Sequence, residues 1–280
     1  RPTKIPMKLL EEGWKNTQIA QYMRETYGVS NEKTALAITI ANREKALLQD
    51  LDYENGYSLY VGIPFCPSIC LYCSFGSHPL ERWTKRVDEY LDALCKELTF
   101  IREEMGERKL TTVYIGGGTP TTLEPEQLRR LLSHIQTTFD FTWVKEYTVE
   151  AGRPDSITRE KLQVMKEFPV TRISVNPQTM NQKTLDVIGR KHTVEDTVNI
   201  FHMARELGFD NINMDLIIGL PGEGKEEVAH TLQKVENLHP DSLTIHSLAL
   251  KRATRLNLFK DKYEEMSFEN SQEIMEMTQQ

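Results

Sequence analysis

Three of the chain's four cysteines stand within eight residues, in the segment GIPFCPSICLYCSFGSHP (62–79). Three residues separate Cys66 from Cys70, and two separate Cys70 from Cys73. Thiolates this close together can bind a soft metal centre, but no second Cys-x-x-Cys pair follows to complete a four-thiolate site. With His78 as a fourth ligand the segment could hold a structural zinc ion. With three thiolates alone it could hold an iron–sulfur cluster that leaves one iron open, which is typical of a catalytic site. The loop by itself leaves both interpretations open.

A glycine-rich segment and three polar residues also stand where a ligand could bind. Residues 116–120 read Gly-Gly-Gly-Thr-Pro and follow a short β-branched run. Because glycine has no Cβ, a ligand can approach such a segment closely and use its backbone N–H and C=O groups. Glu150, Gln178 and Asp215 fall at or near the ends of later runs of the same kind. In α/β barrels the carboxyl ends of the strands collect the active site, so these residues are candidates for one polar site.

The elements that must position these residues alternate from about residue 57 onward. Short runs rich in Val, Ile, Thr and Tyr predict six strands, at 57–63, 111–117, 146–152, 171–177, 211–219 and 242–248. Amphipathic spacing between them predicts helices at 86–105, 124–139, 194–208 and 224–238. The alternation indicates parallel strands with helical crossovers, and six strands are two fewer than a complete eight-fold barrel has.

Residues 1–50 have a different pattern, since they read as helices without strands. They show a faint helix-turn-helix spacing, but positive and negative charges nearly balance there. We therefore expect a packed helical extension and not a nucleic-acid-binding unit.

Composition narrows the class of protein. The 280-residue chain is 39% hydrophobic and 27% charged, which is typical of a globular protein with a sizeable core. Its formal net charge of −7 disfavours generic binding to nucleic acid or to a membrane surface. No membrane span and no signal peptide are expected, so we predict a cytoplasmic location, where clustered thiols act as ligands before they form disulfides. The first residue is not Met and the last is Gln280, so we expect a piece of a longer protein.

Two further features are expected to have structural roles only. The segment GLPGEGKEE (219–227) approaches a phosphate-binding loop, but Glu226 stands where Ser or Thr should bind magnesium. We interpret it as a strand-to-helix turn. Cys95 lies among leucines in the expected helix at 86–105 and is predicted to be a small buried residue.

In series, the motifs of this chain resemble a known enzyme family. The three-cysteine loop, with Tyr72 just before the third cysteine, resembles the signature of radical S-adenosylmethionine (SAM) enzymes. Over about residues 58–255, YVGIPFC, YIGGGTPT, VEAGRPD, NPQTM, IGRKHT and MDLIIGLPGE together resemble the oxygen-independent coproporphyrinogen III oxidase (coproporphyrinogen dehydrogenase) family, in the branch of Gram-positive anaerobes. The resemblance implies an α/β fold, a partial (β/α)6 radical SAM barrel with a helical N-terminal extension. The expected boundaries are 1–52 for the extension, 53–255 for the barrel and 256–280 for the start of a helical C-terminal region.

The resemblance also implies the cofactors. Cys66, Cys70 and Cys73 would hold a [4Fe–4S] cluster whose open iron chelates the amino and carboxylate groups of SAM. An electron passed through the cluster would cleave SAM to methionine and a 5′-deoxyadenosyl radical. Arg190 suits a carboxylate through its bidentate fork, and Asp215 suits the ribose hydroxyls. The implied contacts to SAM are Tyr60, Tyr72, Gly117, Gly118, Thr119, Glu150, Gln178, Arg190, Asp215 and Ala249.

The implied reaction is an oxidation in heme biosynthesis. Hydrogen abstraction from a propionate of coproporphyrinogen III, followed by loss of carbon dioxide and an electron, would leave a vinyl group. Two such rounds would give protoporphyrinogen IX. Flavodoxin or ferredoxin is the expected class of electron donor. Arg153, Arg172 and Arg252 are candidate partners for the propionates by position only.

One departure leaves the substrate open. Phe75 stands where some relatives carry another cysteine, two residues after the triad. Relatives without that cysteine include a branch that resembles heme chaperones. The alternatives are therefore a heme-binding chaperone on the same scaffold, or a radical SAM enzyme with another anionic substrate. Outside the family, a zinc-stabilised binding module remains an alternative.

Overall fold

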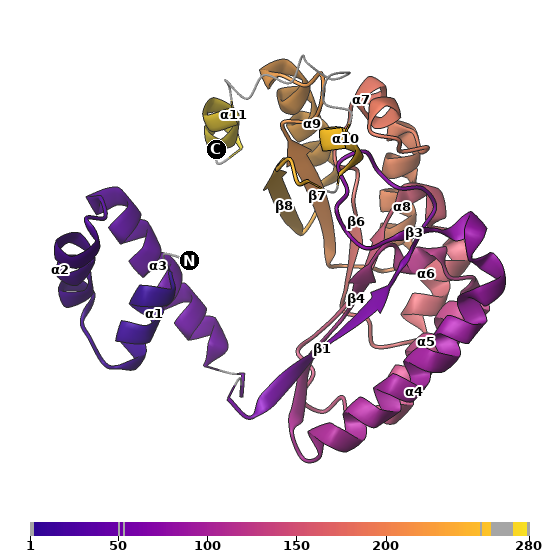
Figure 1. Cartoon of the computed structure of the whole chain (residues 1–280), viewed down its shortest axis with the longest axis horizontal. Helices are drawn as coiled ribbons and strands as arrows, with labels where there is room; N and C mark the ends of the chain where they lie inside the picture. The colour runs from indigo at the N-terminus through magenta and orange to yellow at the C-terminus, as the bar shows by residue number, and fades with distance from the viewer. Residues whose placement is uncertain (1–2, 50, 53, 253, 259–270, 279–280) are drawn as a thin grey trace. The chain divides into compact units, whose positions relative to one another are not determined.

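The computed structural model of the chain describes residues 3–49, 51–52, 54–252, 254–258 and 271–278 (Figure 1). Contacts within it divide the chain into two compact units, Arg1–Tyr57 and Ser58–Gln280. The second unit contains the cysteine loop and nearly all of the sheet that carries it.

The first unit is helical. Its helices are α1 (Lys4–Glu11), α2 (Asn16–Tyr27) and α3 (Asn31–Leu48). Gly28, with a φ of 62°, ends α2 in the left-handed conformation that glycine tolerates. Ser30 begins α3, and its hydroxyl accepts a hydrogen bond of 3.4 Å from the backbone N–H of Lys33. Buried side chains of all three helices form one core. The prediction of helices without strands over residues 1–50 is confirmed for the part of that segment the structure describes.

The second unit is a curled half-barrel built on one six-stranded sheet. Its strands are β1 (Gly56–Ile63), β4 (Lys109–Gly117), β5 (Glu146–Gly152), β6 (Arg172–Val175), β7 (Ile212–Ile218) and β8 (Ser242–Ser247). They lie in chain order, β1-β4-β5-β6-β7-β8, and the pairs from β4 to β8 are parallel. All six predicted strands are present, and none differs from its predicted bounds by more than two residues at either end. The sheet is open because β1 and β8 form its two edges.

Helices connect the strands as the alternation predicted. Those of the second unit are α4 (Val87–Met105), α5 (Pro125–Thr138), α6 (Arg159–Lys166), α7 (Gln182–Val187), α8 (Val194–Glu206), α9 (Lys225–Leu238), α10 (Arg255–Leu258) and α11 (Ser271–Met277). Short elements are β2 (Phe65–Cys66), β3 (His78–Pro79), and the 3₁₀ turns η1 (Leu80–Arg82), η2 (Thr84–Arg86), η3 (Pro120–Thr122) and η4 (Pro154–Ser156). Figure 1 shows α4, α5, α6 and α8 on one side of the strands. The turn before α9 is the strand-to-helix connection predicted for 219–227.

The register of the strands makes one face of the sheet polar. On β4, Val113 and Ile115 are buried, whereas Tyr114 between them is only half-buried. Tyr114 pairs with Thr148 of β5, and the same register continues across the sheet, pairing Glu150 with Ser174. Since paired residues of parallel neighbours point to the same face, polar side chains from several strands share it. The candidate site lies where this face meets the carboxyl ends of the strands.

Candidate functional site

The cysteine loop follows β1 and is tied to other parts of the barrel. Pairing of β2 with β3 closes the base of the loop. The N–H of Leu71 donates a hydrogen bond of 2.9 Å to the carbonyl of Ile188, and the carbonyl of Leu71 accepts one of 2.9 Å from the N–H of Leu256. The hydroxyl of Ser68 donates to the carbonyl of Gly189 over 3.1 Å. These bonds hold a loop with little regular structure against the segment after α7 and against α10.

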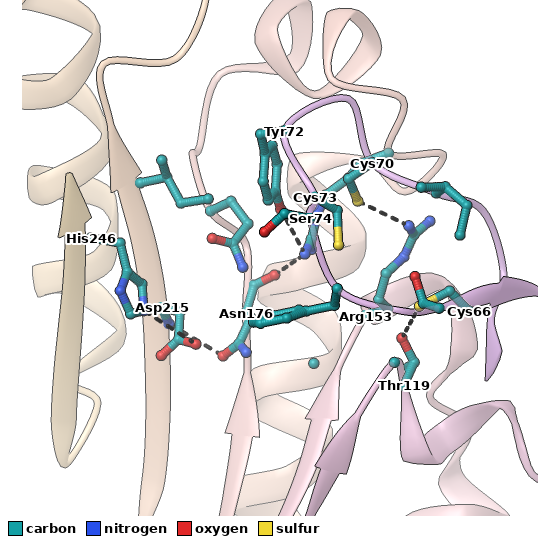
Figure 2. A pocket seen from close by; sticks show the side chains of 18 of the residues that line it. Cys66, Cys70, Tyr72, Cys73, Ser74, Thr119, Arg153, Asn176, Asp215 and His246 are labelled. Atoms are coloured by element: carbon teal, nitrogen blue, oxygen red, sulfur yellow. Dashed lines mark hydrogen bonds and ion pairs between the residues drawn. The ribbon is translucent and has the colours of Figure 1, made fainter. Parts of the chain in front are cut away.

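The loop forms one wall of a cavity of about 340 Å³ (Figure 2). Twelve of the thirteen residues that the resemblance assigned to the cluster and to SAM line this cavity: Cys66, Cys70, Tyr72, Cys73, Gly117, Gly118, Thr119, Glu150, Gln178, Arg190, Asp215 and Ala249. The expectation that residues at successive strand ends meet at one place is therefore confirmed. Their roles toward cluster and cofactor stay predictions.

Tyr60 is the residue that the structure does not bring into the lining. Its side chain is 63% exposed, and its ring stacks on that of Tyr114 with 5.8 Å between centroids and 10° between planes. Burial raises the pKa of Tyr60, and the nearby charge of Glu150, which lines the cavity, raises it further. A contact between Tyr60 and SAM remains a prediction.

The thiols are mostly shielded from water. Cys66 and Cys70 are buried, Cys73 is half-buried, and none of the three is in a disulfide. Burial raises the pKa of Cys66 and of Cys73. The hydroxyl of Thr119 donates to the sulfur of Cys66 over 3.5 Å. Among the residues that the structure describes, no three His, Cys, Asp or Glu side chains are grouped closely enough to hold a single metal ion.

The glycine turn after β4 packs closely against the backbone of residues 63–65, which the sequence did not predict. A Cβ on Gly118 would lie 2.5 Å from the carbonyl oxygen of Phe65, and one on Gly117 would lie 3.0 Å from the backbone N and O of Ile63. The N–H groups of Gly118 and Thr119 donate to the carbonyls of Ile63 and Phe65 over 2.6 and 2.7 Å. These two N–H groups are therefore not open to a ligand, because the carbonyls of Ile63 and Phe65 already accept from them. The predicted contact between the turn and SAM is not tested by this and stays a prediction.

Two carboxylates face the cavity from β5 and β7. Burial, together with the nearby charge of Asp215, raises the pKa of Glu150 to about 7, although Arg190 and the backbone N–H of Gly117 act in the opposite direction. The side chain of Asp215 accepts a hydrogen bond of 2.7 Å from the amide of Asn213. Near neutral pH the carboxyl group of Glu150 is therefore partly protonated, and it can donate as well as accept a hydrogen bond.

Arg190 and Gln178 carry polar atoms for which the protein supplies no partner. The guanidinium of Arg190 is buried and donates to the carbonyl of Asn176 over 2.5 Å and to the hydroxyl of Tyr72 over 3.4 Å, but its Nε has no partner among the described residues. Gln178 has a φ of 69°, and its backbone forms hydrogen bonds with the backbones of Asp215 and Ile217. Its side-chain Oε1 is buried and has no hydrogen-bond partner among the residues that the structure describes. An unpaired buried donor and acceptor at one cavity fit a polar ligand, since leaving them bare is costly.

Three contacts in the lining were not predicted from the sequence. Asn176 bridges β6 and β7, because its side-chain oxygen accepts from the N–H of Asp215 over 3.2 Å. The ring of His246 lies 4.0 Å from the carboxylate of Asp215 (Figure 2). Arg153 donates to the sulfur of Cys70 over 3.4 Å. Asn176 and Arg153 stand in motifs already singled out, NPQTM and VEAGRPD, whereas the contact of His246 has no local signal.

The arginines proposed as propionate partners are not alike. Arg153 is 3% exposed, lines the cavity and makes two hydrogen bonds to Asp155, so its guanidinium already has a partner within the chain. Its contact with a propionate stays a prediction. Arg172 hydrogen-bonds the hydroxyl of Ser242 over 3.0 Å and lines a separate shallow depression. Arg252 is exposed, as a contact to an external anion would need.

The fourth cysteine stands apart from this cavity. Cys95, on α4, is half-buried, so it is less enclosed than predicted, and it does not line the cavity. Among the described residues, no helix has the length and apolar character needed to cross a membrane.

Comparison with known proteins decides the family. Residues 60–235 match the family model described as the Radical SAM superfamily. The chain belongs to the radical SAM superfamily. Proteins of this superfamily use a [4Fe–4S] cluster and SAM, and the lining of three thiols with unpaired polar atoms fits both groups.

Curated relatives narrow the group within the superfamily. The chain is 42% identical to the oxygen-independent coproporphyrinogen-III oxidase-like protein HemZ of Bacillus subtilis, over 99% of this chain and 56% of that protein. It is 38% identical to the heme chaperone HemW of the same organism over 70% of this chain and 52% of that protein. It is also 31% identical to the oxygen-independent coproporphyrinogen III oxidase of Escherichia coli over 87% of this chain and 53% of that protein. The resemblance read from the motifs is confirmed, and the chain spans about half the length of these relatives.

A solved structure supports the same placement. The radical SAM coproporphyrinogen III oxidase HemN of Escherichia coli superposes with a TM-score of 0.70 and 29% identity, over 84% of this chain and 54% of that one. The chain thus falls in the group that contains HemZ, HemN and HemW.

Proposed function

We propose that this chain is the cofactor-binding part of a radical SAM coproporphyrinogen III dehydrogenase. The observation that carries the proposal is the single cavity in which three thiols meet the glycine turn and polar residues from four strand ends. The identity of 42% to a coproporphyrinogen-III oxidase-like relative supports the substrate class.

In this proposal Cys66, Cys70 and Cys73 hold the [4Fe–4S] cluster. When bound, cluster and SAM supply a 5′-deoxyadenosyl radical. A zinc ion on the same thiols is disfavoured, because the proposed fourth ligand, His78, packs its ring against Trp83 at 5.2 Å and does not line the cavity. A structural zinc site is normally closed by four ligands, whereas a cluster takes one thiolate per iron.

The chain's own residues bind and orient SAM. Arg190 carries the unpaired Nε that suits a carboxylate, and Gln178 carries an unpaired acceptor that suits an ammonium or amino group. Asp215 accepts from hydroxyl groups, and Glu150, with its pKa near 7, can donate or accept a hydrogen bond at neutral pH. Because these side chains are buried or half-buried, they also exclude water from a reactive intermediate.

The proposed reaction is oxidative decarboxylation of two propionates to vinyl groups, giving protoporphyrinogen IX in heme biosynthesis. The electron donor would be a small redox protein such as flavodoxin or ferredoxin. The test is anaerobic reconstitution with iron and sulfide, reduction with dithionite, and addition of SAM with or without coproporphyrinogen III. Formation of 5′-deoxyadenosine that is accelerated by the porphyrinogen, with loss of carbon dioxide, is the expected result. If 5′-deoxyadenosine formed at the same rate with and without the porphyrinogen, the proposed substrate would be wrong.

A heme chaperone on the same scaffold is the second candidate. The heme chaperone HemW of Bacillus subtilis is 38% identical to this chain, more than the 31% of the Escherichia coli oxidase, although it matches a shorter part of the chain. Phe75, at the cavity and 72% exposed, offers an apolar surface where some relatives carry a further cysteine. Titration with heme, followed by the Soret band, separates the two, since stoichiometric binding without decarboxylation would favour the chaperone. Product analysis with other anionic substrates would reveal a radical SAM enzyme of different specificity.

A further inference from the structure

Arg153 is a charged residue in direct contact with a thiol of the cysteine loop. It follows β5, and its side chain is almost completely buried. Its Nη1 donates to the sulfur of Cys70 over 3.4 Å and to the carbonyl of Ser68 over 3.2 Å (Figure 2). Both partners belong to the cysteine loop, so one guanidinium holds the loop and contacts one of its sulfur atoms.

The rest of the guanidinium is held by Asp155. Its Nε and Nη2 donate to the two carboxylate oxygens over 2.9 and 2.6 Å, a bidentate pair that sets the plane of the group. The hydroxyl of Ser156 donates to the carbonyl of Arg153 over 2.8 Å and anchors the backbone beneath it. These contacts fix the orientation of the guanidinium, so that Nη1 points toward the cysteine loop. Burial alone would raise the pKa of Asp155, but hydrogen bonds and charge from Arg153 bring it below its usual value.

The contact at Cys70 differs in kind from the one described at Cys66. The sulfur of Cys66 receives a neutral hydroxyl, that of Thr119, at 3.5 Å. The sulfur of Cys70 receives a cationic donor that is shielded from water. A charge in a poorly solvated place acts more strongly on its neighbour than the same charge at the surface.

We propose that Arg153 is a positioning residue that raises the reduction potential of the cluster through the sulfur of Cys70. This inference rests on the proposed role of Cys70 as a cluster ligand. Reduction adds an electron, which increases the negative charge on the cluster and its thiolates. A hydrogen-bond donor that carries positive charge stabilises the reduced state more than the oxidised state, and hydrogen bonds to sulfur are among the features that set such potentials. Asp155 keeps the donor oriented and offsets part of its charge.

The test measures the midpoint potential of the reconstituted cluster in the parent chain and in Arg153→Met, together with iron and sulfide content. We expect the equilibrium constant for reduction to fall about tenfold in the variant, which corresponds to a potential about 59 mV more negative. Arg205→Met is the matched control. Arg205 also pairs with an aspartate, Asp241, and also donates to a backbone carbonyl, that of Phe209, but it does not line the cavity. Its potential should equal that of the parent.

Two further variants separate the effect on the potential from a loss of folding. Arg153→Lys keeps the charge without the fork and should shift the potential less than Arg153→Met. Arg153→Met combined with Asp155→Leu removes both charges, so no carboxylate is left buried without a partner, and it should keep the lowered potential.

Several results would overturn the proposal. A loaded Arg153→Met cluster with the potential of Arg205→Met would do so. Loss of the cluster from both the single and the double variant would also do so, because Arg153 would then be needed for assembly. A parent chain that binds no iron would overturn the cysteine assignment as well. A parent that holds the cluster but ignores the porphyrinogen would overturn only the proposed substrate and would leave this inference supported by its own potentials.

Discussion

Replacing Gly118 by alanine tests whether the glycine turn exists for the ligand or for the chain. The added Cβ would lie 2.5 Å from the carbonyl oxygen of Phe65 and 2.8 Å from that of Ile63. Ordinary van der Waals contact begins near 3.4 Å, so one of the two segments must shift by about 0.9 Å. The same shift would stretch the hydrogen bond of 2.6 Å from the N–H of Gly118 to Ile63.

Overpacking of this kind typically costs about 1–3 kcal/mol. For a unit of this size, each kcal/mol corresponds to about 2–4 °C in the midpoint of thermal unfolding. We therefore expect Gly118→Ala to lower the free energy of unfolding by about 1–3 kcal/mol. The loss should appear without SAM and without the cluster, because the strained contacts lie within the chain.

The assay is thermal and urea unfolding of the chain without cofactors, followed by circular dichroism. Gly76→Ala is the matched control, since Gly76 lies in the same cysteine loop and a Cβ there would meet nothing within 4 Å. Its stability should equal that of the parent. If Gly118→Ala unfolded like the parent but bound SAM more weakly, the glycine would serve the ligand and our reasoning would be refuted.

Three further predictions follow from the same cavity. Replacing any one cysteine of the 66–73 loop by alanine should abolish stable binding of the cluster, measured as iron and sulfide content, whereas Cys95→Ala should retain it. Glu150→Gln should remove a pH dependence of stability. Since the folded pKa of Glu150 is about 7 and its unfolded value is 4.5, its protonated form contributes stability at low pH that is lost as pH rises through 7, by up to about 3 kcal/mol. Parallel curves of unfolding free energy against pH for parent and variant would contradict this. Arg190→Lys should weaken SAM binding by about tenfold or more in calorimetry, because lysine lacks the fork, and unchanged affinity would exclude the carboxylate contact.

Local patterns were enough to predict the framework of this chain. Strand runs bounded by glycine or proline predicted the whole six-stranded sheet, because period and composition are properties of short segments. The helices α6 and α7, with 8 and 6 residues, were not predicted, since helices this short give little periodicity to recognise. Cys95 was placed in the correct helix but is less buried than its leucine neighbours suggested.

Predictions about the cavity succeeded where they depended on strand ends. Glu150, Gln178 and Asp215 meet because parallel strands bring their carboxyl ends to one edge of the sheet. Arg190 joined them through the family resemblance, because its place after α7 has no signal of its own in a single sequence.

Local composition predicted the parallel sheet, and the spacing of the cysteines predicted the group of thiols, because both are properties of short segments. The superfamily followed from the resemblance of the motifs taken in series. Only the tertiary structure decided what each group is bound to. It showed that the N–H groups of Gly118 and Thr119 already donate hydrogen bonds to the carbonyls of Ile63 and Phe65. It also showed that the guanidinium of Arg153 donates hydrogen bonds to Cys70 and Asp155. Cys70 and Arg153 are 83 residues apart, and nothing local records a contact over that separation, since it arises only when the sheet brings the two segments together.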